Sequence, residues 1–239
     1  MFLNRTIKKT FNYFGLDIVK KSKVPQWSFL GLKNIAIKTI IDVGANTGQF
    51  AKSILPIFPR AIIYCFEPLP KQFEELNKWV KKQNGRAMAF NIGLSDRKGE
   101  KEIFSHVDHS PSSSFLKTTK ICENYYPLTK TQEAISVKIT TLDNLVSSNS
   151  LHLESEILIK IDVQGYENRV IFGGKKTFDL AKACILEVNI ENLYEGQANF
   201  RDITKLLYEF GFQYAGNLNQ TYADDGRVIF IDAVFVKDH

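Results

Sequence analysis

The sequence has little of what marks metal-binding, membrane-spanning or secreted proteins. It contains 3 cysteines in 239 residues, and they form neither a CxxC pair nor another metal-ligand spacing. No stretch approaches the roughly 18 apolar residues of a membrane span, and the N-terminus lacks the apolar core and cleavage site of a secretory signal. We therefore expect a cytoplasmic location and reduced, buried cysteines. These are Cys65, Cys122 and Cys184.

Most of the chain also lacks net charge. The formal charge of +5 comes from residues 1–38, where eight basic residues face one acid and give +7, so residues 39–239 carry −2. A nearly neutral body argues against a large nucleic-acid footprint, and we expect no nucleic-acid partner. The basic segment 1–38, called the N-terminal arm below, has enough cations to contact phosphates or an anionic membrane.

Apolar residues recur in the N-terminal arm at near-helical spacing, which predicts an amphipathic helix. The apolar face of this helix has two alternative environments. It packs on protein, either the rest of the chain or a second copy in a homodimer, or it lies in a membrane interface. Residues 39–239 are long enough for one α/β domain with a substantial core. The recurring residues are Phe2, Leu3, Ile7, Phe11, Phe14 and Ile18.

The segment Thr39–Pro68 contains a strand, a glycine turn, a helix and a second strand. The turn at 44–48 lets the backbone approach a ligand where a Cβ would collide. The second strand ends on Glu67, where α/β folds place the acid that binds a ribose diol. Asn46 replaces the middle glycine of the GxGxxG turn, which counts against NAD. The pattern predicts a site for an adenosyl cofactor with an amine, formed by Asp42, Gly44, Ala45, Asn46, Gly48, Glu67 and Pro68.

A third predicted strand, 87–92, leads into Gly93, Leu94 and Ser95. These three residues either flank an adenine or form a plain turn after a core strand. The segment 105–133 then loses periodicity and becomes polar. We expect a lid-like loop over the acceptor site, with disorder as the alternative, because loops of this length are uncommon as mere connectors.

Two more carboxylates follow predicted strands, and the chain finishes with a hairpin pattern. Asp162 ends a central strand, and Glu187 lies near the carboxyl end of the strand after it. The last two strands, 212–215 and 228–236, are joined by a turn at 224–226, which predicts an antiparallel hairpin. Such a terminal hairpin is typical of methyltransferases, whereas dehydrogenase sheets are usually parallel to the edge.

The chain resembles the FkbM-type S-adenosylmethionine-dependent methyltransferases in seven motifs, namely DVGANTGQF, FEPLP, GLSD, SPSSSF, TLDNL, IKIDVQGYE and ILEVN. The resemblance runs from about residue 40 to 236 and implies an α/β, Rossmann-like class I methyltransferase fold with a seven-stranded, mostly parallel sheet and a C-terminal antiparallel hairpin. It also implies that residues 44–48 contact the methionine part of the cofactor, that Glu67 binds the ribose and that Leu94 flanks the adenine. The family's usual KIDVEG block reads KIDVQG here, so Gln164 replaces an acid.

The resemblance further implies that residues 39–239 are a catalytic domain that uses S-adenosyl-L-methionine to O-methylate a sugar, a polysaccharide or a small natural product. A nucleic-acid methyltransferase and a non-catalytic Rossmann-like binding module are the alternatives. An alcohol acceptor benefits from a general base, typically by about 10²–10⁴-fold. We assign no metal, because we expect Asp162 and Glu187 to form hydrogen bonds rather than share Mg²⁺. Asp162 is also a candidate cofactor contact. The candidate catalytic residues are Asp162, His106, His109 and Glu187.

Overall fold

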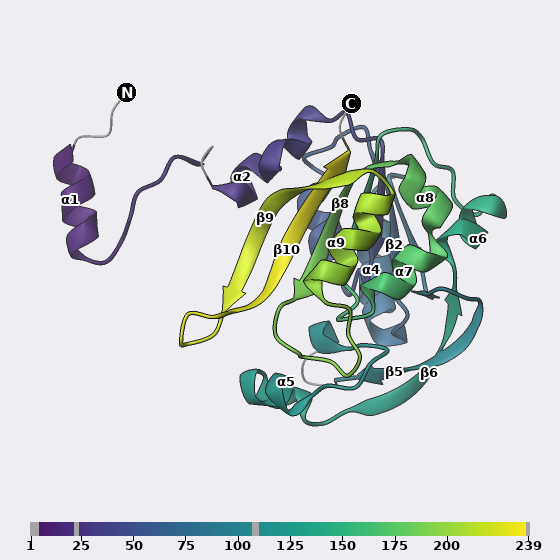
Figure 1. Ribbon diagram of the computed structural model, residues 1–239. Helices are drawn as coiled ribbons and strands as arrows, with labels where there is room; N and C mark the ends of the chain where they lie inside the picture. The colour runs from purple at the N-terminus through teal and green to yellow at the C-terminus, as the bar shows by residue number, and fades with distance from the viewer. Residues whose placement is uncertain (1–4, 22–23, 107–109, 238–239) are drawn as a thin grey trace.

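The computed structural model describes residues 5–21, 24–106 and 110–237. Its centre is a seven-stranded sheet in the order β3-β2-β1-β7-β8-β10-β9 (Figure 1). β10 is antiparallel to both neighbours, and the other pairs are parallel, so the predicted sheet and terminal hairpin are confirmed. The strands are β1 (Thr39–Val43), β2 (Ile62–Phe66), β3 (Ala87–Phe90), β7 (Ile157–Ile161), β8 (Ala181–Asn189), β9 (Phe212–Tyr222) and β10 (Val228–Lys237).

Helices cover both faces of this sheet, and each face has its own apolar cluster. α3 (Gln49–Ile54) and α4 (Pro70–Val80) pack on one face, and α6 (Leu142–Ser147), α7 (Glu167–Gly173), α8 (Lys175–Leu180) and α9 (Phe200–Glu209) pack on the other. Ile40 belongs to the α3 face and Ile41 to the α7 face. Because side chains alternate along a strand, Asp42 and Lys160 point to the α3 face.

A second, three-stranded sheet of order β4-β6-β5 lies beyond the carboxyl ends of the parallel strands (Figure 1). Its strands are β4 (Gly93–Leu94), β6 (Glu133–Thr140) and β5 (Gly99–Ser105). The described part of segment 105–133 is not a continuous loop, because it contains the short helices η3 (Ser110–Ser112), α5 (Lys120–Tyr125) and η4 (Pro127–Thr129). Helices of 3 to 6 residues are too short to produce a readable helical period.

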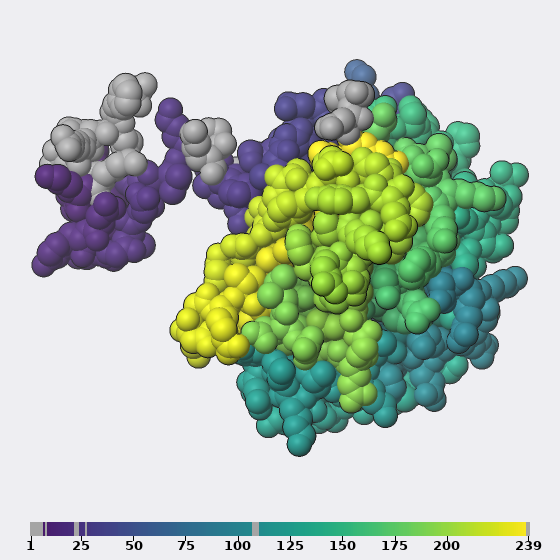
Figure 2. Space-filling model, in the orientation of Figure 1, coloured from purple at the N-terminus to yellow at the C-terminus, as the bar shows by residue number. Residues whose placement is uncertain are grey.

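The first helix of the N-terminal arm stands apart from the sheet (Figures 1 and 2). α1 (Arg5–Tyr13) ends sooner than the apolar pattern predicts, and Gly15 just beyond it has φ +71°. The side chains of Tyr13 and Phe14 are exposed. By contrast, α2 (Pro25–Ser28) and η2 (Phe29–Asn34) contact the edge strand β9. Within the described ranges, every helix is too short or too polar to span a bilayer.

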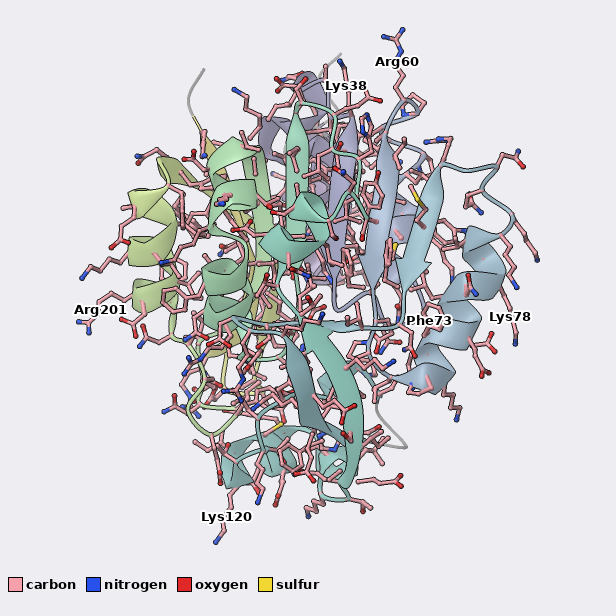
Figure 3. All side chains as sticks on the ribbon, turned by 90° about the vertical axis from the view of Figure 1, so that its right-hand side faces the viewer. Lys38, Arg60, Phe73, Lys78, Lys120 and Arg201 are labelled. Carbon is pink, nitrogen blue, oxygen red and sulfur yellow. The ribbon has the colours of Figure 1, made fainter. Side chains whose placement is uncertain are left out.

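Charged side chains lie mainly at the periphery and point outward in Figure 3, as do those of Lys38, Arg60, Lys78, Lys120 and Arg201. Three buried carboxyl groups are exceptions to this distribution: Asp42, Glu67 and Glu167 are at most 4% exposed. Glu167 Oε1 accepts hydrogen bonds from the amides of Val163 and Gly165, so it fixes the turn after β7. Asp42 and Glu67 lie near the carboxyl ends of β1 and β2, where ligands bind in open α/β sheets.

The chain turns tightly after β1, and this turn brings the ends of β1 and β7 together. The amides of Gly44 and Ala45 both donate to the carbonyl oxygen of Phe66. Gly44 has φ +75°, and a Cβ on it would lie 1.9 Å from the carbonyl oxygen of Asp162. Glycine is therefore required both for the left-handed backbone and for the close approach of Asp162.

Gly85 offers a matched comparison for Gly44, because it has φ +81° but no atom within 4 Å of its hypothetical Cβ. We expect Gly85→Ala to cost about 1–2 kcal/mol, the penalty of a left-handed residue alone. Gly44→Ala should cost about 1–3 kcal/mol more, because the Asp162 backbone must move. Urea unfolding of both variants measures the difference, and equal losses would contradict the close approach.

Candidate active site

A cavity of about 360 Å³ opens at the carboxyl ends of β1, β2 and β7. It extends from the glycine turn after β1 to the first half of β10, and η3 contributes to its rim. Its lining includes Gly44, Ala45, Asn46, Glu67, Pro68, Gly93, Leu94, Ser110, Pro111, Lys160, Asp162, Gln164, Ile185, Glu187, Leu218 and Asp232. Most of the residues predicted to bind a cofactor are therefore brought together in one place.

Asn46 shapes the glycine turn with both its backbone and its side chain. Its φ is +47°, a conformation that Asn adopts more readily than most residues. The side-chain Oδ1 accepts from the amide of Thr47 at 2.8 Å, and Nδ2 donates to Ser110 Oγ at 3.2 Å. The second contact ties the turn to η3 across the cavity. Gly48 has φ +88° and N-caps α3, and it does not line the cavity.

Glu67 holds the turn after β2 against the glycine turn. Its Oε2 accepts from the Asn46 amide at 2.7 Å, and its Oε1 accepts from the Leu69 amide at 2.9 Å. Burial raises the pKa of Glu67 to about 7, although both amide bonds oppose this rise. Each carboxylate oxygen has a second lone pair, so Glu67 retains the capacity to accept from two adjacent hydroxyl groups in the cavity.

The residues predicted to flank an adenine divide into two groups. Gly93 and Leu94 line the cavity, and a Cβ on Gly93 would lie 2.7 Å from Phe115 Cζ. Ser95 does not line the cavity. Its hydroxyl lies 3.0 Å from Tyr166 Oη and 3.1 Å from Asp96 Oδ1, so its side chain joins the residue after β4 to the N-cap residue of α7. The structure thus gives Ser95 structural contacts rather than a ligand-facing position.

Lys160 is a largely buried cation between the ends of β1 and β7, and the sequence motifs did not indicate it. Its Nζ lies 3.5 Å from Asp42 Oδ1 and 3.2 Å from Asp162 Oδ2. Burial lowers the pKa of Lys160, but Asp162 and Asp42 together raise it above its ordinary value. Burial raises the pKa of Asp42, and Lys160 opposes that rise. A single lysine in the otherwise apolar run ILIKI was the signal available in the sequence.

Gln164 bridges the two carboxylates that the sequence placed on neighbouring strands. Its Nε2 donates to Asp162 Oδ1 at 2.9 Å and also to Glu187 Oε1. Its Oε1 accepts from Tyr194 Oη at 2.7 Å. The amide therefore supplies two donors between two acceptors, an arrangement that an ionised glutamate could not form. Asp162 and Glu187 do come together, and a hydrogen-bonding amide lies between them.

Asp232 of β10 is a further cavity carboxyl that the sequence motifs did not indicate. It pairs with Glu187 in the strand register. Burial and nearby Asp162 raise the pKa of Asp232 to about 6, while Lys160 and a hydrogen bond from Asn219 oppose the rise. Burial, Asp162 and Asp232 raise the pKa of Glu187 well above its ordinary value. Asp232 follows an apolar run in the last strand, and only the sheet order brings it to the site.

The two candidate histidines have different outcomes. His106 is 1% exposed, its Nδ1 lies 3.3 Å from the carbonyl oxygen of Thr131, and it does not line the cavity. It is therefore placed in the packing of segment 105–133 rather than at the site. His109 lies outside the described residues.

Within the described ranges, His, Cys, Asp and Glu side chains form no group that would hold a metal ion.

We expect Gln164→Glu to destabilise the protein in a pH-dependent way. The new carboxyl would face Asp162 and Glu187, which raises its folded pKa above the unfolded value. The penalty should be small below about pH 4 and should reach about 1–3 kcal/mol at pH 8, where the lost donors leave acceptors unpaired. Thermal unfolding across this pH range tests the prediction. Gln213→Glu, exposed on β9, is the control, and equal effects of the two changes would contradict the bridging role.

Comparison with known proteins finds methyltransferases among the similar sequences. A 2-O-methyltransferase, NoeI, of Sinorhizobium fredii is 32% identical over 182 residues, which cover 72% of this chain and 71% of that protein. A hexuronic acid methyltransferase, AglP, of Haloferax volcanii is 26% identical over 168 residues, covering 70% of this chain and 60% of that protein.

A similar fold occurs in the crystal structure of methyltransferase FkbM from Methylobacillus flagellatus. The TM-score is 0.52 at 11% sequence identity, and the match covers 84% of this chain and 44% of that chain. This chain therefore spans less than half of that protein, and the likeness shows the shared fold. The family model of the methyltransferase FkbM domain matches residues 42–214. Because this match covers well over half of the sequence, the chain belongs to the methyltransferase FkbM domain family.

Proposed function

We propose that this protein is an S-adenosylmethionine-dependent O-methyltransferase that acts on a hydroxyl of a sugar, as part of a glycan or a small natural product. The observation that carries the proposal is the single cavity that holds the glycine turn, Glu67 and Leu94 at the carboxyl ends of β1, β2 and β4. The names of the relatives NoeI and AglP, a 2-O-methyltransferase and a hexuronic acid methyltransferase, support a sugar hydroxyl as the acceptor.

The residues present fit the proposed cofactor. Glu67 has lone pairs for the ribose hydroxyls, and Gly44 lines the cavity with its backbone alone. The carboxylate of Asp162 lies at the cavity wall and suits a cationic amine. Leu94 and Phe115 supply apolar surface for a purine. When bound, S-adenosylmethionine supplies an electrophilic methyl group on a good leaving group.

The protein's own contribution is then mainly positioning. A fixed cavity wall that holds the acceptor oxygen in line with the methyl carbon removes much of the barrier, because orientation is achieved before reaction. Asn46, which joins the glycine turn to Ser110, links the cofactor side of the cavity to segment 105–133. We propose that this segment acts as a lid, and the contributions of Ser110, Pro111 and Ser114 to the cavity lining support this role.

We also propose a cytoplasmic location, supported by the three free, buried cysteines.

For the N-terminal arm, we propose peripheral contact with an anionic membrane. The arm carries +7, and α1 stands away from the sheet with exposed apolar side chains nearby (Figure 2). A homodimer formed through the arm is the competing proposal.

The cofactor proposal predicts that S-adenosylhomocysteine binds the protein and that the affinity depends on pH. A ribose diol donates to the ionised form of Glu67, whose pKa is raised to about 7. The affinity should therefore fall as the pH drops below about 7, approaching tenfold for each pH unit. Titration calorimetry from about pH 5.5 to 8.5, a range that brackets the pKa of Glu67, measures the affinity.

Two variants provide the controls for this prediction. Glu67→Ala should lose one charge-assisted contact, about 1.5–3 kcal/mol of binding free energy, and Glu67→Gln should bind weakly with little pH dependence. Glu75→Ala, exposed on α4, should bind like the wild type. A wild-type affinity that is constant across this pH range would contradict the ribose role. No binding of the nucleoside at any pH would contradict the proposed function itself.

For the arm, we expect the full chain to sediment with vesicles that contain phosphatidylglycerol but not with pure phosphatidylcholine, and to be released by salt. Phe14→Ser should weaken this binding, whereas Tyr222→Ser, on the exposed end of β9, should not. Equal behaviour with both vesicle types would exclude the membrane proposal. A dimer in sedimentation velocity that Phe14→Ser dissociates would favour the second copy instead.

A further inference from the structure

The cavity continues beyond the residues assigned to the cofactor. Its far end lies on the α3 face of β7, β8, β10 and β9, where Ile185, Glu187, Leu218 and Asp232 form the lining. The strand register places Glu187 opposite Asp232, and Ile185 opposite Lys160. This end, called the distal end below, is therefore a built surface of adjacent strands, continuous with the proposed cofactor site.

The charges at the distal end disfavour an anionic ligand. Glu187 and Asp232 both line it, and Asp162 lies beside them. Among the described residues that line the cavity, Lys160 is the single cation, and it is already shared between Asp42 and Asp162. A carboxylate or phosphate on the acceptor would meet like charges with no cation left to pair with it. Hydroxyl groups, in contrast, can donate to these carboxyl oxygens.

Apolar side chains complete the distal end. Ile185 and Leu218 are at most 9% exposed, and Phe50 lines the cavity from α3. The Lys160 ammonium lies 5.7 Å from the centre of the Phe50 ring. An apolar wall beside hydroxyl-accepting groups matches the two kinds of surface on a sugar ring, its C–H face and its hydroxyl edge.

Two carboxyl groups line the distal end and Asp162 lies beside them, and their contacts distinguish the three. Asp162 forms an ion pair with Lys160 and also accepts a hydrogen bond from Gln164. Glu187 accepts from Gln164, and burial together with Asp162 and Asp232 raises its pKa well above the ordinary value of a glutamate. Asp232 has a pKa raised to about 6, so it is ionised at neutral pH yet more basic than an ordinary aspartate.

On this basis, and resting on the proposed function, we propose that the distal end is the acceptor subsite, that it takes an uncharged sugar, and that Asp232 is the general base. The acceptor oxygen gives its proton to the Asp232 carboxylate and bonds to the methyl carbon. The bond from that carbon to sulfur breaks, and its electron pair stays on sulfur. Asp232 then returns the proton to solvent.

The first experiment compares two pools of oligosaccharides with a labelled methyl donor. One pool holds neutral galactans, mannans and xylans, and the other holds oligogalacturonates and oligoglucuronates. We expect at least about tenfold more label in the neutral pool, the factor that a single unpaired like-charge contact supplies. Equal or greater labelling of the uronate pool would overturn the proposal.

The remaining outcomes separate this proposal from the proposed function. If S-adenosylhomocysteine binds but neither pool is labelled, the sugar acceptor fails, and the acceptor subsite fails with it. If the nucleoside does not bind, the proposed function fails first. Because Glu67 also titrates near neutral pH, all rates are measured with saturating methyl donor.

The second experiment tests Asp232 directly on the labelled neutral acceptor. Asp232→Asn should lower kcat by about 10²-fold or more, with the S-adenosylhomocysteine Kd within about twofold of wild type. The wild-type rate should rise with pH through about 6, since Asp232 must be ionised to accept a proton. The variant should lose this rise. The pKa of Asp232 is set by burial, by Asp162 just after β7, by Lys160 on β7 and by Asn219 on β9, and Glu187 on β8 faces Asp232 in the strand register.

A matched control and a stability measurement make the second experiment decisive. Asp224→Asn, exposed in the hairpin turn between β9 and β10, should leave kcat and its pH dependence unchanged. Full activity of Asp232→Asn would overturn the base assignment. So would a loss of activity that parallels lost cofactor binding or lost thermal stability, because that result would assign Asp232 a structural role.

Discussion

The ion pairs of Lys160 hold the centre of the site together. This lysine joins Asp42 at the end of β1 to Asp162 at the end of β7, in a part of the sheet where neighbouring side chains are apolar. Both Asp42 oxygens are buried, and the Lys160 ammonium lies 3.5 Å from Oδ1. Removing the cation would leave an uncompensated buried charge, which typically costs about 3–5 kcal/mol. The same cation permits several carboxyl groups to gather at one sheet edge.

Gln164 also joins neighbouring carboxyl groups, but through hydrogen bonds from a neutral amide. Its amide donates to Asp162 and Glu187, and its carbonyl accepts from Tyr194. With φ +55°, it also sits in the turn that brings Gly165 against the segment around Tyr194. The departure from the family's acidic residue at this position therefore has a structural consequence: the carboxyl pair is held by hydrogen bonds. One cation and one amide together define which carboxyl oxygens face the cavity.

Local patterns predicted much of the fold and half of the site. The glycine turn, Glu67 and Leu94 lie within short stretches whose strand and turn signals are strong, and the structure brings them into one cavity. Segment 105–133 was harder, because its helices are too short to show a period. β9 extends well beyond the predicted 212–215, since it is an edge strand with many exposed polar residues that mask its alternation.

Two of the missed site residues share one cause. Leu218 and Asp232 lie in strands whose neighbours are far apart in sequence, and only the order β7-β8-β10-β9 places them near Lys160. His106 shows the converse error: it lies in a polar segment next to candidate site residues, yet it is buried away from the cavity. A residue type shows which chemistry a side chain can perform, but the sheet topology is needed to decide whether that side chain lies in the site.

Both proposals place an adenosyl nucleoside at one end of a single cavity and the acceptor at the other. A crystal structure with S-adenosylhomocysteine tests this arrangement most directly. We expect ribose hydroxyls within hydrogen-bonding distance of Glu67 and a sulfur atom that faces the end lined by Glu187 and Asp232. A nucleoside bound elsewhere, or a sulfur turned away from these two carboxyl groups, would contradict it.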